Sequence, residues 1–143
     1  MEENKNEHYM RLALAEAEKA YEKQEVPVGA VVVCEDMVIA RAHNLTETLR
    51  DPTAHAEMQV ITAASSWLGG KYLTDCTVYV TFEPCAMCAG AIGWSQAAKV
   101  VYGTGDEKKG YTKVSNALLH PATKVQKGVL EDECRELMTR FFR

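Results

Sequence analysis

The chain has 143 residues, 47% of them hydrophobic and 25% charged, and carries a formal net charge of −4 at pH 7. This length suffices for one ordinary domain with its own hydrophobic core, and the composition excludes a disordered or collagen-like chain. The sequence contains neither a repeat of fixed period nor a low-complexity tract, so we expect a single domain over residues 1–143.

The charge is unevenly distributed along the chain. Residues 1–98 carry 7 basic and 14 acidic side chains, whereas residues 99–143 carry 9 basic and 6 acidic ones. Basic residues gathered in one segment can attract phosphates even when the total charge is negative, which leaves a nucleic-acid partner open. A solvated surface of mixed charge accounts for the same distribution equally well.

The N-terminal segment and the cysteines indicate the cellular compartment in which the protein is expected. Residues 1–24 are acidic and amphipathic, unlike a signal peptide, and no segment is long enough to cross a membrane. We therefore expect a cytoplasmic protein without a membrane partner. There, an odd number of cysteines argues against a disulfide framework, and a close pair favours metal or redox chemistry. The five cysteines are Cys34, Cys76, Cys85, Cys88 and Cys134.

The first part of the chain predicts a helix followed by a hairpin. Apolar residues at three- and four-residue steps indicate an amphipathic helix over residues 7–24, which Pro27 ends. Two short runs rich in β-branched residues follow at 28–34 and 37–42. The two-residue break between them, Glu35-Asp36, predicts a β-hairpin.

Alternating strands and helices are predicted for the rest of the chain. A second helix is expected to begin at Asp51-Pro52 and to end at Gly69-Gly70. Its buried face is predicted to carry Met58, Ile61 and Leu68. Further strands are predicted at 77–82, 99–103 and 124–130, and further helices at 85–96 and 131–142. This alternation predicts an α/β fold whose sheet is covered by helices on both faces.

Two short motifs contain residues that bind metals. Cys85 and Cys88 lie three positions apart in the first turn of a predicted helix, so both sulfurs point to the same side. The positive end of the helix dipole favours the thiolate, which is the form that binds zinc. His55 would supply a nitrogen ligand from another helix start. Because residues i and i+2 diverge on a regular helix, His55 and Glu57 can face one centre only if His55 precedes the helix.

One histidine and two cysteines make three ligands. Structural zinc sites normally have four protein ligands, whereas catalytic sites leave the fourth position to water. Water on zinc is acidified to a pKa near ~7, so hydroxide becomes available at neutral pH. Glu57, which is not a ligand in this scheme, would accept a proton and pass it to a ring nitrogen and then to a departing amine.

Each motif alone has low specificity. Cys-x-x-Cys also occurs in redox pairs and structural zinc sites, and another cysteine, His43 or His120 could complete a closed four-ligand site. The order His-x-Glu, then about thirty residues, then Pro-Cys-x-x-Cys is the signature of the zinc nucleobase deaminases. The combination therefore predicts a catalytic centre.

Beyond these motifs, the chain resembles the bacterial tRNA-specific adenosine deaminases of the cytidine deaminase-like superfamily from about residue 8 to residue 142. The shared stretches include VPVGAVVV (26–33), DPTAHAEM (51–58), VYVTFEPCAMCAGA (78–91) and GVLEDEC (128–134). The resemblance implies a three-layer α/β/α fold with a five-stranded mixed sheet, and a homodimer.

The resemblance also implies the reaction and its residues. Zinc-bound hydroxide would attack C6 of adenosine at the wobble position of a tRNA anticodon stem-loop, with Glu57 as proton shuttle, giving inosine. Asn44 would hydrogen-bond the flipped base and Pro84 would shape the pocket; locally, Asn44 is explained nearly as well as a turn-forming residue. The ligands of one Zn²⁺ per chain would be His55, Cys85 and Cys88.

One stretch departs from the family pattern. In relatives that act on tRNA, the stretch corresponding to GAIGWSQAAK (90–99) often contains basic residues or a histidine. Trp94 in this stretch is instead reminiscent of small-base deaminases such as guanine deaminase. Trp94 could stack on a free base, or belong to the core or to a dimer interface. The alternative function is therefore deamination of a free nucleobase or nucleoside, of guanine or cytosine type. A third is a non-catalytic, zinc-stabilised binding module, which requires four protein ligands.

Overall fold

The computed structural model describes residues 2–143, which form four helices and five strands. In chain order these are α1 (Glu2–Glu22), β1 (Gly29–Cys34), β2 (Met37–His43), α2 (Ala56–Leu68), β3 (Cys76–Phe82), α3 (Ala86–Ser95), β4 (Lys99–Thr104), β5 (Lys124–Lys127) and α4 (Glu131–Phe141). Two short 3₁₀ turns, Tyr111–Lys113 and Asn116–Leu118, lie between β4 and β5. None of the helices in this range is long and apolar enough to span a membrane.

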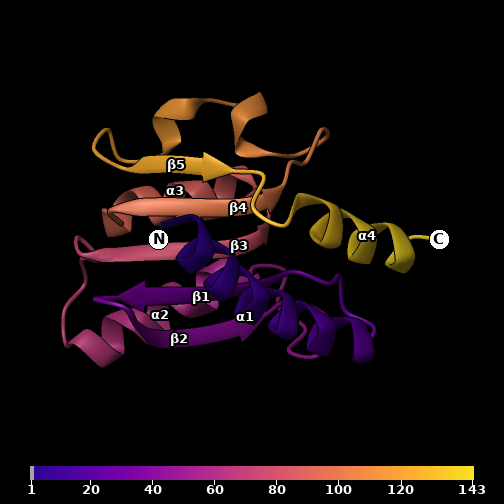
Figure 1. The fold of residues 1–143 in the computed structure, drawn as a ribbon. Coiled ribbons are helices and arrows are strands. Elements are labelled where there is room, and N and C mark those ends of the chain that lie inside the picture. The colour runs from indigo at the N-terminus through magenta and orange to yellow at the C-terminus, as the bar shows by residue number, and fades with distance from the viewer. Residues whose placement is uncertain (1) are drawn as a thin grey trace.

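The five strands form one mixed sheet in the order β2-β1-β3-β4-β5. β1 is antiparallel to both β2 and β3, whereas β3, β4 and β5 run parallel. Figure 1 shows α1 in front of this sheet, with α2 and α3 behind it. The predicted α/β/α fold with a five-stranded mixed sheet is confirmed.

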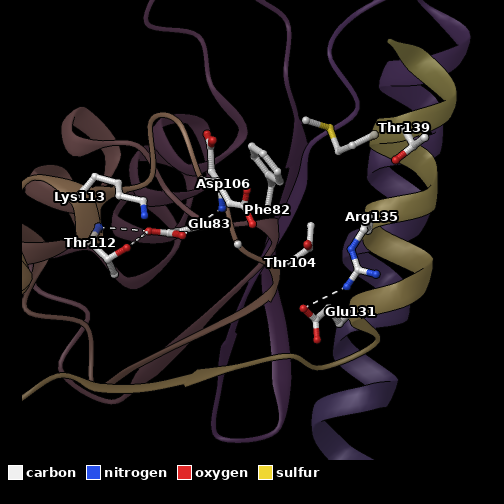
Figure 2. A pocket seen from close by; sticks show the side chains of 12 residues that line it. Phe82, Glu83, Thr104, Asp106, Thr112, Lys113, Glu131, Arg135 and Thr139 are labelled. Carbon is white, nitrogen blue, oxygen red and sulfur yellow. Dashed lines mark hydrogen bonds and ion pairs between the residues drawn. The ribbon is translucent and has the colours of Figure 1, made fainter. Parts of the chain in front are cut away.

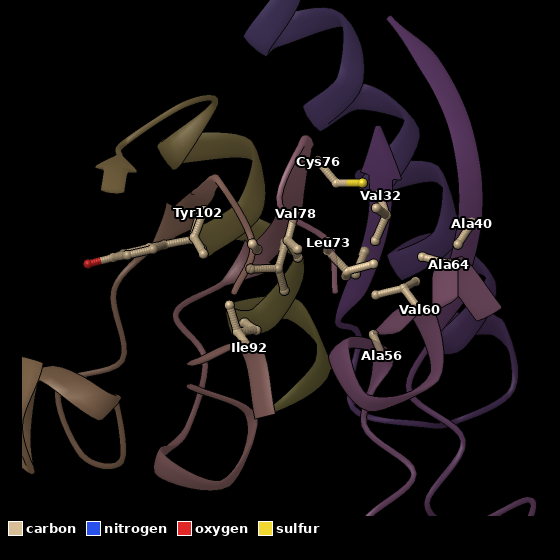
Figure 3. Packing of buried hydrophobic residues seen from close by; sticks show 14 of the residues in the cluster. Val32, Ala40, Ala56, Val60, Ala64, Leu73, Cys76, Val78, Ile92 and Tyr102 are labelled. Atoms are coloured by element: carbon tan, nitrogen blue, oxygen red, sulfur yellow. The ribbon is translucent and has the colours of Figure 1, made fainter. Parts of the chain in front are cut away.

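The alternation of side chains along the strands divides the core into two layers. On one face, Val31, Val33, Tyr79 and Val101 pack against Met10 and Ala13 of α1 and Cys134 of α4. On the other face, strand residues that include Val32, Val78 and Val100 pack against α2 and α3 (Figure 3). Because the second layer also buries Ala56 at the start of α2 and Ala89 in α3, it fixes where these two helices begin.

The hairpin is formed as predicted, and its turn explains how an acidic pair is tolerated. Glu35 and Asp36 both have positive φ, at 52° and 63°, and Cys34 is paired directly with Met37. Two residues of positive φ define the turn whose twist matches that of the strands. Asp36 also accepts a hydrogen bond from Lys5 at 3.1 Å, which ties the turn to α1.

The predicted start of the second helix is wrong, and of its predicted buried face only Ile61 packs against the core, where it is partly buried. Asp51 instead ends a preceding turn, where its Oδ1 accepts hydrogen bonds from the backbone N–H and the hydroxyl of Thr53 at 2.9 and 2.7 Å. The helix begins at Ala56, five residues later than expected. The fully buried face toward the sheet is formed by Ala56, Val60 and Ala64, whereas Leu68 is 38% exposed.

Candidate metal centre

Three sequence-predicted ligands are carried by the starts of two neighbouring helices. His55 is the N-cap of α2 and has extended backbone angles (φ −70°, ψ 155°), and Cys85 is the extended N-cap of α3 (φ −73°, ψ 175°). Cys88 lies in the first turn of α3. His55 therefore does precede the regular helix, which is the condition under which it and Glu57 can face one centre. Both helix starts also contribute partial positive charge, which favours thiolates.

The three donor atoms form a compact group. The Nδ1 of His55 lies 3.3 Å from the Sγ of Cys88 and 3.7 Å from the Sγ of Cys85, and all three donor atoms lie within 4.8 Å of one another. Zinc–sulfur and zinc–nitrogen bonds in a tetrahedral site imply a nitrogen–sulfur separation of about 3.5 Å. The geometry and the donor types therefore fit a zinc ion.

No fourth protein ligand completes the group. Within residues 2–143, only His55, Cys85 and Cys88 form a cluster of three or more potential metal ligands. His43 is bonded to Glu16 instead, with its Nδ1 2.9 Å from Oε1, and the His120 Nδ1 accepts the backbone N–H of Ala122. A closed four-ligand structural site is thus not formed by the described residues, and the fourth position of a tetrahedral ion is left to a non-protein ligand.

The electrostatics of the cluster suit a cation. A hydrogen bond with Cys88, aided by His55, lowers the pKa of the Cys85 thiol to about 4. The hydrogen bond with Cys85, burial and the charge of Glu57 raise the pKa of Cys88, so the two sulfurs hold one proton between them. The hydrogen bond with Cys85 also raises the pKa of His55, against the effect of its burial. A bound metal ion would replace the protons that the group holds in its absence.

Glu57 lies in the first turn of α2 beside this cluster and is only 3% exposed. Burial raises the pKa of its carboxyl group to about 7, with a smaller opposing effect from the backbone N–H and His55. A carboxyl group with this pKa can gain and lose a proton near neutral pH, which is the property of a general acid–base.

The cluster opens into a cavity of about 260 Å³. Asn44 and Thr46, from the loop after β2, line this cavity together with Val26 and Val28. Its remaining lining residues come from the helix starts, the end of β3 and the loop after β4: His55, Ala56, Glu57, Phe82, Glu83, Cys85, Asp106 and Lys109. A substrate in this cavity can therefore reach the metal centre and Glu57 together.

Asn44 and Pro84 occupy different positions relative to the cavity. Asn44 lines it and also forms a turn, since its Oδ1 accepts the backbone N–H of Thr46 at 3.2 Å and its Nδ2 donates to the Val26 carbonyl at 3.3 Å. Pro84 is buried and is not part of the lining, and its carbonyl accepts the N–H of Tyr111 at 2.9 Å. Pro84 can thus act on the cavity only through the backbone around Cys85.

A second, larger cavity of about 560 Å³ adjoins the first, sharing Phe82, Glu83 and Asp106 with it (Figure 2). It lies between the loop after β4 and α4, where Arg135 forms an ion pair with Glu131 at 3.1 Å. This larger cavity holds none of the metal-binding residues. The chemistry therefore belongs to the smaller cavity, and the larger one extends the surface available beside it.

Sequence reasoning missed several residues of the site. Phe82 and Glu83 line the cavity and lie within the shared stretch 78–91, but no role was predicted for them, and Asp106 and Lys109 belong to no motif. Glu83 could have been suspected from its place between a predicted strand and Pro84-Cys85, whereas nothing in the sequence marks Asp106 or Lys109.

Comparison with known proteins gives a consistent assignment. The family described as the cytidine and deoxycytidylate deaminase zinc-binding region matches residues 3–104, which include the three candidate ligands and Glu57. A tRNA-specific adenosine deaminase from Bacillus subtilis (strain 168) is 49% identical over 144 residues, covering 96% of this chain and 89% of that relative.

Solved structures agree with this match. One from studies of A-to-I editing by tRNA:A34 deaminases at the wobble position of transfer RNA has a TM-score of 0.85 at 43% identity, covering 91% of this chain and 98% of that one. A guanine deaminase from Bacillus subtilis is 34% identical, with a TM-score of 0.66, over 80% of this chain and 70% of that one. The chain therefore belongs to the zinc-dependent cytidine deaminase-like proteins and, within them, to the tRNA-specific adenosine deaminase family.

Proposed function

We propose that residues 1–143 form a single zinc-dependent deaminase domain that converts adenosine to inosine at the wobble position of a tRNA. The observation that carries the proposal is that His55 and Cys85, which cluster with Cys88, line one cavity together with the buried Glu57. The relatives support the substrate, because the identity to tRNA-specific adenosine deaminases, 49% and 43%, is higher than the 34% identity to a guanine deaminase.

The proposed reaction replaces the 6-amino group of adenine by oxygen from water and releases ammonia. When bound to the three ligands, Zn²⁺ would acidify a water molecule beside the base. Glu57 would take a proton from that water at its carboxylate and donate it to N1 of the ring. As the water oxygen bonds to C6, the Glu57 carboxylate would take the remaining proton from the new C6 hydroxyl group and deliver it to the 6-amino group, which leaves as ammonia when the C6–N bond breaks. Its burial beside the three ligands places the Glu57 carboxyl group to hold the proton between these steps.

The walls of the cavity would hold the base for this chemistry. We assign Asn44 to hydrogen-bond the flipped base, because its side chain lines the cavity and uses hydrogen bonds to local backbone groups that a base could replace. Pro84 would fix the backbone at Cys85 and so shape the site from behind. Lys109 and Lys108, near the mouth of the cavity, would contact the phosphates of an anticodon stem-loop. Such a substrate would place the enzyme in the cytoplasm.

We also propose that the protein is a homodimer in which α2 and α3 face the partner subunit. These helices cover one face of the sheet and carry large apolar side chains on their outer sides: Trp67, Leu68, Met87 and Trp94, which are 57%, 38%, 37% and 85% exposed. Trp94 is not among the residues that line the cavity beside the candidate ligands, which argues against its stacking on a free base there. Trp94→Glu should convert the dimer to a monomer in light scattering.

The function is tested by presenting the zinc-loaded protein with a tRNA bearing adenosine at the wobble position and, separately, with free guanine, cytosine, adenosine and cytidine. Ammonia release and mapping of inosine in the tRNA are measured together. Inosine at the wobble position, without turnover of the small substrates, supports the proposal. Turnover of a free base with none on tRNA would replace it by the free-base deaminase alternative.

A further inference from the structure

Two buried carboxylates that take no part in the proposed chemistry hold the loops that form the cavity. The first is Glu25, which has no exposed surface and directly precedes the cavity residue Val26. Its oxygens accept the backbone N–H of Glu47 at 3.0 Å, the N–H of Thr48 at 2.6 Å and the hydroxyl of Thr48 at 2.7 Å. These bonds hold the loop after β2, which brings Asn44 and Thr46 to the cavity.

The second carboxylate, Glu83, holds the loop after β4 in the same way. It is 6% exposed and lies two residues before Cys85. Its Oε1 accepts the N–H of Asp106 at 3.0 Å, and its Oε2 accepts the N–H and hydroxyl of Thr112 at 3.1 and 2.7 Å (Figure 2). Gly110 leaves the space for this carboxylate, since a Cβ at Gly110 would overlap it.

Neither carboxylate is neutralised by a cation. No ion pair within the described residues involves Glu25 or Glu83, so each buried charge is stabilised mainly by loop N–H and O–H groups. Burial would raise the pKa of Glu25, but the hydrogen bonds from Thr48 and Glu47 outweigh it and hold this pKa below its ordinary value. A carboxylate can accept bonds from several converging donors, whereas an amide would turn its own N–H groups toward them.

We propose that Glu25 and Glu83 are positioning residues that set the distance between the two loops and thereby the fit of the base in the cavity. Through its hydrogen bonds to the loop after β2, Glu25 positions Asn44 and Thr46 at the cavity. Through its hydrogen bonds to the loop after β4, Glu83 positions Asp106 and Lys109 there. The inference rests on the proposed function for the identity of the substrate. The hydrogen bonds by which Glu25 and Glu83 hold their loops, here called the two loop anchors, do not depend on that function.

The test compares Glu25→Gln and Glu83→Gln with the wild type and with Gly70→Ala, whose added Cβ would contact nothing within 4 Å. KM and kcat are measured on the substrate that the wild type turns over, together with zinc per chain and melting temperature. We expect one zinc per chain and a KM raised about 10–100-fold in both glutamine variants, as for a lost hydrogen bond to a charged group. Gly70→Ala should match the wild type.

Gly110→Ala gives an independent perturbation of the same anchor. Its Cβ should displace the Glu83 carboxylate without changing any charge, and so raise KM as Glu83→Gln does. Thr112→Val removes the hydroxyl donor and should therefore raise KM, by less than Glu83→Gln does. Thr112→Ser keeps the hydroxyl group and should have the wild-type KM.

A purely structural role predicts a different result. It would lower the melting temperature and the active fraction, so that kcat falls while KM stays unchanged, and this outcome overturns the inference. Amide hydrogen exchange provides the second measurement: the N–H groups of Thr48 and Thr112 should lose protection in Glu25→Gln and Glu83→Gln respectively, and unchanged protection also overturns it. If the wild type acts on a free base rather than tRNA, the proposed function fails, while the KM comparison on that base still tests the two anchors.

Discussion

Replacing Glu57 by glutamine removes the proposed proton carrier while keeping the size of the side chain. General acid–base catalysis contributes about 10²–10⁴-fold to a rate, and the other carboxylates among the described residues that line the cavity already accept hydrogen bonds from loop donors. Of the other carboxylates that line the cavity, Glu83 is engaged by the donors of Asp106 and Thr112. Asp106 itself accepts the N–H groups of Lys108 and Lys109, both at 3.0 Å. We therefore expect kcat to fall by about 10²–10⁴-fold.

The same substitution should leave the metal in place. Glu57 is not one of the three clustered donors, so Glu57→Gln should retain one zinc per chain. Inosine formed per zinc-loaded chain is the appropriate measure, because it separates catalysis from metal loss. Glu22→Gln, the same change at an exposed position on α1, controls for the loss of one negative charge and should keep wild-type activity.

Two results would refute this reasoning. A Glu57→Gln variant that is fully loaded with zinc and keeps more than about a tenth of the wild-type kcat would show that another group moves the protons, because the expected loss is at least a hundredfold. A loss of activity that follows loss of zinc would assign Glu57 to the metal centre rather than to proton transfer.

Three further outcomes test the fold and the metal centre. Chelation, or Cys88→Ser, should lower the melting temperature by roughly 10 °C in calorimetry, since ligand at about 1,000 times its Kd stabilises by about 4 kcal/mol. Leu73→Ala should cost about 2–5 kcal/mol in urea unfolding because Leu73 is fully buried, and Leu49→Ala, at an exposed position, far less. Burial opposes ionisation of Glu16, but hydrogen bonds led by His43 hold its pKa below the ordinary 4.5. Its contribution to stability is therefore complete above pH 4.5 and lost as the pH falls through the lowered pKa, and Glu16→Gln should flatten this slope.

The metal centre could be predicted from the sequence because its residues come as two local motifs. Cys85 and Cys88 share a helical turn, and His55 and Glu57 are two positions apart, so only one long-range contact had to be inferred. The requirement that His55 precede the helix followed from helix geometry alone, and the structure meets it at the N-cap of α2. The motif order then excluded most alternative sites.

The start of α2 was mispredicted because two local signals compete. Asp51-Pro52 is a favourable helix start, yet the Asp51 carboxylate is used by the N–H and hydroxyl of Thr53 in a turn. The core decides between these possibilities: small side chains at Ala56, Val60 and Ala64 let α2 lie close to the sheet, as Figure 3 shows. Alanine gives little hydrophobic periodicity, so the larger Met58, Ile61 and Leu68 suggested a face of which only Ile61 packs against the core.

The loop anchors illustrate a different limit of sequence reasoning. The donors that hold Glu25 and Glu83 include backbone N–H groups 22 to 29 positions away, and a backbone N–H is the same whatever residue carries it. In the sequence, Glu25 is therefore indistinguishable from a surface charge, and only its neighbours Pro84 and Cys85 single out Glu83. The matched zinc-binding region ends at residue 104, so it contains the ligands and Glu57 but not the loop that Glu83 holds. A deaminase can thus keep the same metal chemistry while the loops that line its cavity change its substrate. The positions of these loops are apparent only from the fold.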